Sequence, residues 1–466
     1  MMSFLAALSG LLLALAFPKF NLFWLAWIAL VPLFFVLQET KNLKAKIFYG
    51  FVFGLVFFLV QLFWVTTLFR FAGFWVYLGW LSLALYQVVF TLLFVVLLHF
   101  LAQAKKIPFP FLAAICWVFI EWLRNVGFIG GVTAEIGYSQ APFFVLIQIA
   151  DVAAVYGVSF LVVLFNASLV EFIRRKRWPM LLIAVLLAAG ACGYGFYRLG
   201  QSSDFVACKP LTVSLIQPNV DQKDKLDSQK VPEIFAIHEQ MSRQAAQDHP
   251  EIIVWPETAI FSYVLHNAKL RPRLQQIAKD SNAWLVIGTP HYENGKPYNS
   301  IISMSPQGEV IARYDKQHLV PFGEYLPFRT LLFPILKNIG YYDADYTANP
   351  QAELVYAADF RIAPAICFES TFPGLVKSMV SQGADFILTV TNDGWFADSA
   401  ALYSHLNAGV FRAIENRKYF IQVGNTGFTM VIDPLGRVLK KLPINKRGIL
   451  TLKIPLSQDS GRVIVD

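Results

Sequence analysis

Long apolar runs dominate the first 200 residues of the chain. Seven of them lie near residues 3–18, 20–38, 47–68, 74–102, 108–125, 153–172 and 179–197. A helix needs about 20 mainly apolar residues to cross the hydrocarbon core of a bilayer. The pattern therefore predicts a multi-pass α-helical membrane domain over residues 1–200, with about seven transmembrane helices.

From about residue 210 the pattern changes to short apolar runs that alternate with amphipathic stretches. Strand-like runs include "LTVSLIQPNV", "EIIVWPETAI", "FRIAPAICFES" and "ADFILTVTNDGWF", and helix-like stretches such as "VPEIFAIHEQMSRQAAQ" lie between them. Strands that alternate with helices indicate a layered α/β domain. We expect this domain to span residues 210–455, followed by a tail, residues 456–466, with no apolar run.

Charge divides the chain at the same place. Residues 1–200 hold 13 Lys/Arg and 5 Asp/Glu, and the remaining 266 residues hold 26 of each. The net charge of +8 therefore belongs to the apolar part and gives no indication of nucleic-acid binding. The mean hydropathy of +0.51 is also higher than an ordinary soluble protein would have.

Basic residues in the short loops predict how the chain is oriented in the membrane. The segments "KNLKAK", "QAKK" and "RRKR" follow the second, fourth and sixth apolar runs. Short loops rich in Lys and Arg stay in the cytoplasm. The amino terminus is then inside, and seven crossings put the α/β domain outside. We therefore expect a protein of the bacterial inner membrane with its α/β domain on the periplasmic side.

The start, "MMSFLAALSG", lacks the positive charge of a signal peptide and predicts a retained span.

Several common kinds of active site are not supported by the sequence. It contains no C-x-x-C, H-E-x-x-H or Walker A motif, and "GYSQA" lacks the last glycine of a serine nucleophile elbow. We expect neither a metal nor an organic cofactor.

Three titratable residues each follow a strand-like run of the α/β domain. Glu257 ends "IIVWPE", Lys316 ends "EVIARYDK" and Cys367 ends "FRIAPAIC". Strand ends can meet at one edge of an α/β sheet. A carboxylate can take the proton of a thiol, and an ammonium group can stabilise a thiolate and an oxyanion. The pattern leaves plainer alternatives open: a helix N-terminal acid, a surface lysine and a packed cysteine, or a disulfide between Cys208 and Cys367.

Longer motifs around these residues resemble one family. They are "IVWPETAI", "YDKQHLVPFGEYLPF", "AICFES" and "NDGWFADSAALYSHLNAGVFRAIEN". The chain resembles the apolipoprotein N-acyltransferases, membrane members of the nitrilase (carbon-nitrogen hydrolase) superfamily, over nearly its whole length. The resemblance implies a nitrilase-like αββα sandwich for residues 210–455. It also implies catalysis by a Glu257–Lys316–Cys367 triad, with Cys367 as nucleophile, Glu257 as general base and Lys316 as electrostatic partner.

The activity that the resemblance implies is a two-step (ping-pong) acyl transfer. A fatty acyl chain leaves a phospholipid, which we expect to be phosphatidylethanolamine, and forms a thioester on the cysteine. It then passes to the N-terminal amine of an S-diacylglyceryl-cysteine lipoprotein, which is the last step of lipoprotein maturation. The two competing hypotheses are a membrane-anchored amidase, which would use water as acceptor, and a scaffold without activity.

Five further residues are candidates for the substrate-binding part of the site. We expect Glu324 and Glu369 to support the triad, Phe368 and Trp395 to line an acyl pocket, and Asn392 to hold the "NDGWF" turn. The alternatives are surface or helix-terminal carboxylates, core aromatics and an ordinary turn asparagine.

An apolar segment and two departures from the family complete the prediction. Residues 325–342 are apolar but broken by Pro327 and Pro334, which favours an arm that dips into the bilayer over a spanning helix; the alternative is a buried loop. The family normally ends with another spanning helix, so residues 456–466 predict an outer carboxyl terminus. Leu226 stands where the family often has tryptophan.

Overall fold

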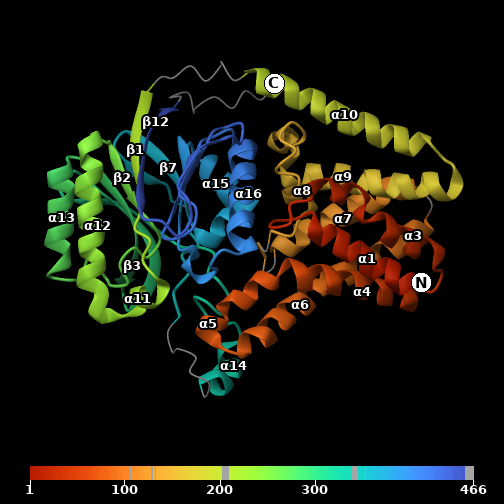
Figure 1. Cartoon of the computed structure of the whole chain (residues 1–466), viewed down its shortest axis with the longest axis horizontal. Helices are drawn as coiled ribbons and strands as arrows, with labels where there is room; N and C mark the ends of the chain where they lie inside the picture. Colours follow the sequence, from red (N-terminus) through yellow and green to blue (C-terminus); the bar gives the residue numbers. More distant parts are fainter. Residues whose placement is uncertain are drawn as a thin grey trace. The chain divides into compact units, whose positions relative to one another are not determined.

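The computed structural model describes residues 1–104, 106–126, 130–131, 133–201, 209–337, 345–351 and 353–456. Its contacts divide the chain into two compact units (Figure 1). The first unit is Met1–Ser202 with Asp398–Glu415, and the second is Ser203–Ala397 with Asn416–Asp466. The segment Asp398–Glu415 thus belongs to the first unit, although in sequence it lies inside the α/β part.

Helices form the first unit. They are α1 (Met2–Leu15), α2 (Ala26–Ala29), α3 (Val31–Glu39), α4 (Leu43–Gln61), α5 (Phe69–Ala72), α6 (Trp75–Gln103), α7 (Phe109–Val126), α8 (Ile136–Ser139), α9 (Ala150–Arg175), α10 (Pro179–Gly200) and most of α16 (Ala400–Asn416).

Among the described residues, five helical segments are long and apolar enough to cross a membrane. They are Leu43–Gln61, Trp75–Gln103, Phe109–Val126, Leu146–Arg175 and Pro179–Gly200. The first two predicted runs form shorter apolar helical segments, Met2–Leu15 and Phe23–Glu39. Five of the seven predicted runs therefore have the length of a span, and the number of crossings stays a prediction.

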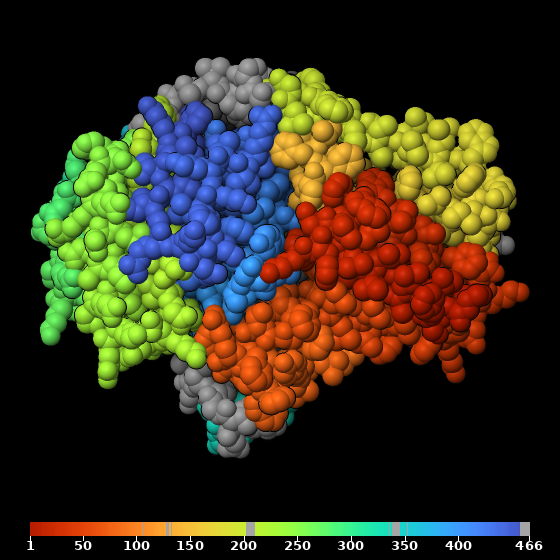
Figure 2. All heavy atoms as spheres, viewed as in Figure 1, coloured from red at the N-terminus to blue at the C-terminus, as the bar shows by residue number. Residues whose placement is uncertain are grey.

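The first unit has large apolar side chains on its surface and a buried ion pair inside. Phe74 is 81% exposed and Leu186 is 60% exposed, and side chains of α6 form much of the orange surface in Figure 2. Arg124 and Glu135, in contrast, form a buried ion pair with 3.2 Å between Nη2 and Oε1. Ionisable groups within membrane-spanning segments face the protein interior and pair with one another. The distribution is that of a membrane-embedded domain.

The second unit contains two six-stranded sheets. The first sheet has the order β12-β1-β2-β3-β4-β5, and the second has the order β11-β10-β9-β8-β7-β6. The strands are β1 (Lys209–Gln217), β2 (Ile252–Trp255), β3 (Trp284–Glu293), β4 (Lys296–Met304), β5 (Val310–Asp315), β6 (Val355–Ala357), β7 (Phe360–Ile366), β8 (Phe386–Thr391), β9 (Phe420–Gly424), β10 (Met430–Ile432), β11 (Val438–Lys441) and β12 (Gly448–Leu456).

Helices pack on the outer faces of the two sheets. Amphipathic α12 (Val231–Ala245) and α13 (Leu270–Ser281) share a buried core with β2 and β3 of the first sheet, and α15 (Pro373–Val380) contacts β7 and β8 of the second (Figure 1). The two sheets contact each other through β1 and β9 and through β4 and β6. Two facing sheets with helices outside confirm the predicted αββα sandwich. Two short helices, α11 (Gln222–Leu226) and α14 (Arg329–Leu336), follow β1 and β5 along the chain.

Strand direction brings the ends of distant segments to the same edges. Strands β1, β2 and β3 are parallel, and β4 is antiparallel to both β3 and β5, so β5 runs in the direction of β3. Strands β7, β8 and β9 of the second sheet are also parallel. The burial of every residue in β2 and β8 is typical of parallel strands covered on both faces.

The predicted apolar arm contains α14, an eight-residue helix with Pro334 inside it. Residues 338–344 of this stretch lie outside the described residues, as does the tail after residue 456. The arm and its contact with a bilayer therefore stay a prediction.

Candidate active site

Glu257 is held in a fixed orientation at the end of β2. The strand stops at Trp255, and the Glu257 carboxylate is buried with only 7% of the residue exposed. Its Oε1 accepts a hydrogen bond from Asn299 Nδ2 at 2.9 Å, and its Oε2 accepts one from the backbone N–H of Asn392 at 2.8 Å. A buried carboxylate needs such donors to remain charged.

Lys316 directly follows β5 and forms ion pairs with two carboxylates. Its Nζ lies 2.9 Å from Oε2 of Glu324 and 3.5 Å from Oε1 of Glu257. Asn299 Nδ2 also donates to Oε1 of Glu324 at 2.7 Å, so one amide joins the two acids. Burial by itself lowers the pKa of a lysine, but Glu324 and Glu257 outweigh it and hold the pKa of Lys316 above its usual range. Lys316 therefore carries a fixed positive charge at neutral pH.

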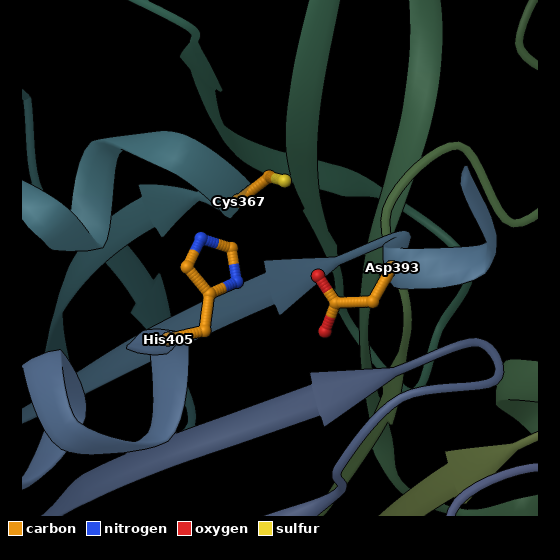
Figure 3. Close-up of side chains that lie close together, drawn as sticks. All are labelled: Cys367, Asp393 and His405. Carbon is orange, nitrogen blue, oxygen red and sulfur yellow. The ribbon is translucent and has the colours of Figure 1, made fainter. Parts of the chain in front are cut away.

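Cys367 directly follows β7 and has a strained backbone. Its φ is 53°, in the left-handed region, which costs a non-glycine residue about 1–2 kcal/mol. The thiol is free and buried. Its Sγ lies within 4.8 Å of a carboxylate oxygen of Asp393, which follows β8 (Figure 3). Cys208, the other half of the alternative disulfide, lies outside the described residues.

The electrostatic surroundings keep the Cys367 thiol protonated. Burial raises its pKa well above the usual range, and the negative charges of Glu257 and Asp393 raise it further. The positive charge of Lys316 and a hydrogen bond with Thr391 act in the opposite direction. Only the thiolate is nucleophilic, so a reaction at this sulfur needs a base that removes the proton when substrate is present.

The carboxylate of Glu369 joins the segment that carries Lys316 to the segment that carries Cys367. It is fully buried and accepts four hydrogen bonds, three of them from residues near Lys316 and one from the residue before Cys367. Burial raises the pKa of Glu369, and Lys316 and the backbone donors oppose that rise. The donors are Tyr314 Oη (2.9 Å), Gln317 N (2.7 Å) and His318 N (3.0 Å) to Oε1, and Ile366 N (2.7 Å) to Oε2.

We expect the change Glu369→Gln to lower kcat/KM by about 100-fold. The amide NH2 group would have to face an N–H or O–H donor, and each lost hydrogen bond to a charged group is worth about 1.5–3 kcal/mol. The neighbouring Lys316 and Cys367 would then lose their alignment. Steady-state kinetics of this variant beside Glu309→Gln, whose residue is exposed, would check the expectation. Equal activity of the two variants would contradict it.

Asn392 belongs to a buried network of amides beside Glu257. Its Nδ2 donates to Oε1 of Gln222 on α11 at 2.8 Å, and its Oδ1 accepts from Asn425 Nδ2 at 3.1 Å. Because its backbone N–H also binds Glu257, Asn392 joins the start of the turn to two amides and to the carboxylate, and its role in holding the turn itself stays a prediction.

The two predicted pocket aromatics are both half-buried. The ring of Phe368 lies 5.0 Å from that of Phe372 and 6.1 Å from that of His318. Trp395 lies on the turn after Asn392. Their role in binding an acyl chain stays a prediction.

Sequence analysis gave no role to three residues of this site, Asn299, Gln222 and Lys225. Lys225 is buried, its Nζ donates to the backbone carbonyl of Glu257 at 3.1 Å, and burial lowers its pKa to about 8 against the opposing charge of Glu257. The signals in the sequence were "YNSI" around Asn299 and the segment "NVDQKDKL", which contains the other two. Neither segment indicates by itself which groups its polar side chains contact in the folded protein.

Cys367 and Asp393 also carry groups that bind metals. Among the described residues of the second unit, the metal-binding group found at this place has two members, Cys367 and Asp393. A zinc site uses three or four protein ligands. Figure 3 also labels His405, which lies on α16 and belongs to the first unit. The expectation of a site without a cofactor stays a prediction.

Two family models match the chain. The model described as "Carbon-nitrogen hydrolase" matches residues 212–459, and the model described as "Apolipoprotein N-acyltransferase N-terminal domain" matches residues 9–168. The first covers the two sheets, and the second covers most of the membrane-embedded helices.

Similar proteins extend over nearly the whole chain. The apolipoprotein N-acyltransferase of Geobacter metallireducens is 34% identical, and the alignment covers 97% of this chain and 89% of that protein. The protein of the same name from Pasteurella multocida is 30% identical, with 98% and 90% covered. Among solved structures, an amidase from Nesterenkonia sp. is 19% identical, covers 54% of this chain and 93% of its own, and has a TM-score of 0.41.

Proposed function

The chain belongs to the apolipoprotein N-acyltransferase family, and on this premise we propose that it transfers a fatty acyl chain from a phospholipid to the N-terminal amine of S-diacylglyceryl-cysteine lipoproteins. The acyl chain is carried between the two substrates as a thioester on Cys367. Covalent catalysis of this kind divides one difficult transfer into two easier steps.

The observation that carries this proposal is the convergence of a carboxylate, an ammonium group and a thiol from three strand ends. Lys316 is ion-paired with Glu257, and the charges of both act on the Cys367 thiol. This arrangement supports a Glu–Lys–Cys triad in which Glu257 is the general base. Glu324 and Asn299 keep Lys316 and Glu257 in place.

In the first half-reaction the Glu257 carboxylate takes the proton of the Cys367 thiol, and the sulfur attacks the ester carbonyl of the phospholipid. Lys316 stabilises the negative charge that develops on the carbonyl oxygen. The C–O bond of the ester then breaks, and the leaving alkoxide takes the proton from Glu257. The products are an acyl thioester and a lysophospholipid.

In the second half-reaction the amine of the lipoprotein attacks the thioester carbon. The C–S bond breaks, an amide forms, and the sulfur regains a proton. An amine can attack a thioester without further activation by ATP, so the energy for amide formation comes from the phospholipid ester by way of the thioester.

The membrane supplies both substrates in this proposal. Five helices with the length and composition of spans support a membrane protein. We assign residues 1–200 to the membrane domain and residues 210–455 to the catalytic domain. The basic loops favour the bacterial inner membrane with the catalytic domain on the periplasmic side. Phosphatidylethanolamine is the donor that we propose, and diacylglyceryl apolipoproteins are the acceptors.

Incubation of the purified protein with phosphatidylethanolamine, without acceptor, is expected to raise its intact mass by one acyl group. Hydroxylamine should remove this group, because it cleaves thioesters readily. The same incubation with phosphatidylglycerol would test the headgroup preference. A later addition of a synthetic diacylglyceryl peptide should return the protein to its original mass and yield an N-acylated peptide.

Absence of the adduct in protein that is folded in detergent would contradict the proposal. An adduct that water removes as fast as the peptide does would favour the amidase hypothesis instead. The measurement therefore separates the two enzymatic readings of the same triad.

A further inference from the structure

Lys225 is a buried cation beside the active site that the triad chemistry does not use. Only 2% of the residue is exposed, and its Nζ donates a hydrogen bond to the main-chain carbonyl of Glu257 at 3.1 Å. A lysine is almost never fully buried unless a partner compensates its charge, and the negative charge of Glu257 acts on Lys225 in this way. Lys225 therefore contacts the general base through a hydrogen bond and through an attraction between charges.

The short helix α11 directs two buried side chains toward Glu257. Gln222 and Lys225 are three residues apart and lie on one face of the helix. Gln222 Oε1 accepts a hydrogen bond from Asn392 Nδ2 at 2.8 Å, and the backbone N–H of Asn392 donates to the Glu257 carboxylate at 2.8 Å. One turn of helix thus reaches the main chain of Glu257 directly and its carboxylate through Asn392.

Helix α11 is itself fixed in place. Its N-cap residue, Asp221, accepts a hydrogen bond from Lys223 N at 2.8 Å. Val220, before the cap, is joined to Asn425, which follows β9. Val220 N donates to Asn425 Oδ1 at 3.0 Å, and Asn425 Nδ2 donates to Val220 O at 2.9 Å. The second sheet therefore holds α11, while Lys225 holds the main chain that follows β2 of the first sheet.

The main chain directly after Glu257 is strained. Thr258 has a φ of 41°, in the left-handed region that residues other than glycine rarely adopt. The carbonyl that Lys225 binds belongs to the peptide between Glu257 and Thr258. Strand β3 also passes close, since a Cβ atom added to Gly288 would lie 2.7 Å from Cα of Glu257. Strained backbone persists only where the surrounding structure fixes it, and the contact with Lys225 is one of the interactions that do so.

Resting on the proposed function, we infer that Lys225 is a positioning residue for the general base. It holds the Glu257–Thr258 peptide in the conformation that presents the carboxylate to the Cys367 thiol, and its positive charge favours the ionised carboxylate. The thiol proton passes from Cys367 Sγ to a carboxylate oxygen of Glu257, and Lys225 keeps its own protons during this step. Lys225 thus acts through Glu257, whereas Lys316 acts on the oxyanion.

The variant Lys225→Met tests this role because it keeps the apolar stem of the side chain but removes the donor and the charge. An acyl p-nitrophenyl ester reports acylation of Cys367 directly through the release of p-nitrophenol. We expect the maximal acylation rate to fall by about 30-fold, the range for loss of a hydrogen bond that involves a charged group. The ester concentration that gives half the maximal rate should stay within about twofold of the wild type.

The pH dependence of acylation separates this role from one in packing alone. The titratable groups whose charges interact with that of Glu257 include Lys225, Lys316, Cys367 and Tyr346. Loss of the positive charge at position 225 makes the carboxylate easier to protonate. The acid limb of the acylation rate should therefore move to higher pH by about half a unit or more. A role in packing alone would lower the rate without moving this limb.

A second substitution tests the strained turn. Glycine adopts a positive φ without strain, so Thr258→Gly should restore part of the maximal rate that Lys225→Met loses. The acid limb should stay at its shifted position in the double variant, because glycine supplies no charge. The matched control is Lys223→Met, the same change at an exposed residue of the same helix. It should leave both the rate and the pH profile as in the wild type.

Gln222→Met gives an independent test on the same helix and keeps the inference testable if Lys225→Met does not fold. It removes the acceptor for Asn392 but no charge. We expect the maximal acylation rate to fall by about tenfold and the acid limb to stay in place. A limb that moves in Gln222→Met, or a rate equal to that of the wild type, would contradict the positioning of Glu257 by α11.

The outcomes that overturn the inference are distinct from those that overturn the proposed function. A rate in Lys225→Met less than about threefold below the wild type, an acid limb that does not move, or no recovery with Thr258→Gly would each contradict it. Equal effects of Lys223→Met would contradict it as well. The activated ester makes these assays independent of phospholipid. Failure of the wild type to accept acyl groups from phosphatidylethanolamine would therefore count only against the proposed function.

Discussion

The change Cys367→Ala is expected to lower kcat/KM for acyl transfer by about 10⁴-fold or more, because it removes the atom that carries the acyl group. The intact-mass experiment should show no adduct on this variant, even after long incubation with phospholipid. The effect should be on chemistry and not on folding, since alanine fits the space of the thiol.

The chain offers matched controls for this experiment. Cys116 is buried in α7, and Cys192 is half-buried in α10. The variants Cys116→Ala and Cys192→Ala should both form the adduct at the rate of the wild type. An adduct that persists in Cys367→Ala, or that disappears in either control, would show that the acyl group is carried elsewhere.

The change Lys316→Met is expected to lower both activity and stability. It removes the cation between Glu257 and Glu324, whose carboxylates are both in contact with Asn299. Removing one partner of a buried ion pair costs about 3–5 kcal/mol, because the other charge is left without compensation. We expect a loss of about 10³-fold in kcat/KM, and a fall of about 10 °C in the midpoint of thermal unfolding in detergent.

A double variant separates the two effects of this change. In Lys316→Met with Glu324→Gln one of the two buried negative charges is also gone, so thermal stability should recover in part. Activity should not recover, because no positive charge is left to stabilise the oxyanion. Recovery of activity in the double variant would show that Lys316 has only a structural role.

The pattern of apolar residues predicted the two-part architecture because each environment imposes its own period and length. Spans need about 20 apolar residues, and parallel strands covered on both faces need short, nearly continuous apolar runs. The run "FILTVT" became the fully buried β8 in this way. The first two runs, residues 3–18 and 20–38, gave the shorter helical segments Met2–Leu15 and Phe23–Glu39, because an apolar run does not define where a helix is interrupted.

The position of a residue at the end of a strand was also visible in the sequence. Lys316 and Cys367 directly follow β5 and β7, and Glu257 lies two residues after β2. The sequence placed a thiol, a carboxylate and an ammonium group at strand ends, and its resemblance to the apolipoprotein N-acyltransferases was what predicted acyl transfer for them.

Only the tertiary structure decided which groups meet. Asn299 contacts both Glu257 and Glu324. Glu369 accepts hydrogen bonds from residues beside Lys316 and Cys367. A carboxylate oxygen of Asp393 lies within 4.8 Å of Cys367 Sγ. These contacts depend on the direction and register of strands that are far apart in the chain. A sequence pattern records the local preference of each segment, whereas the distance between two side chains follows from packing all the segments together.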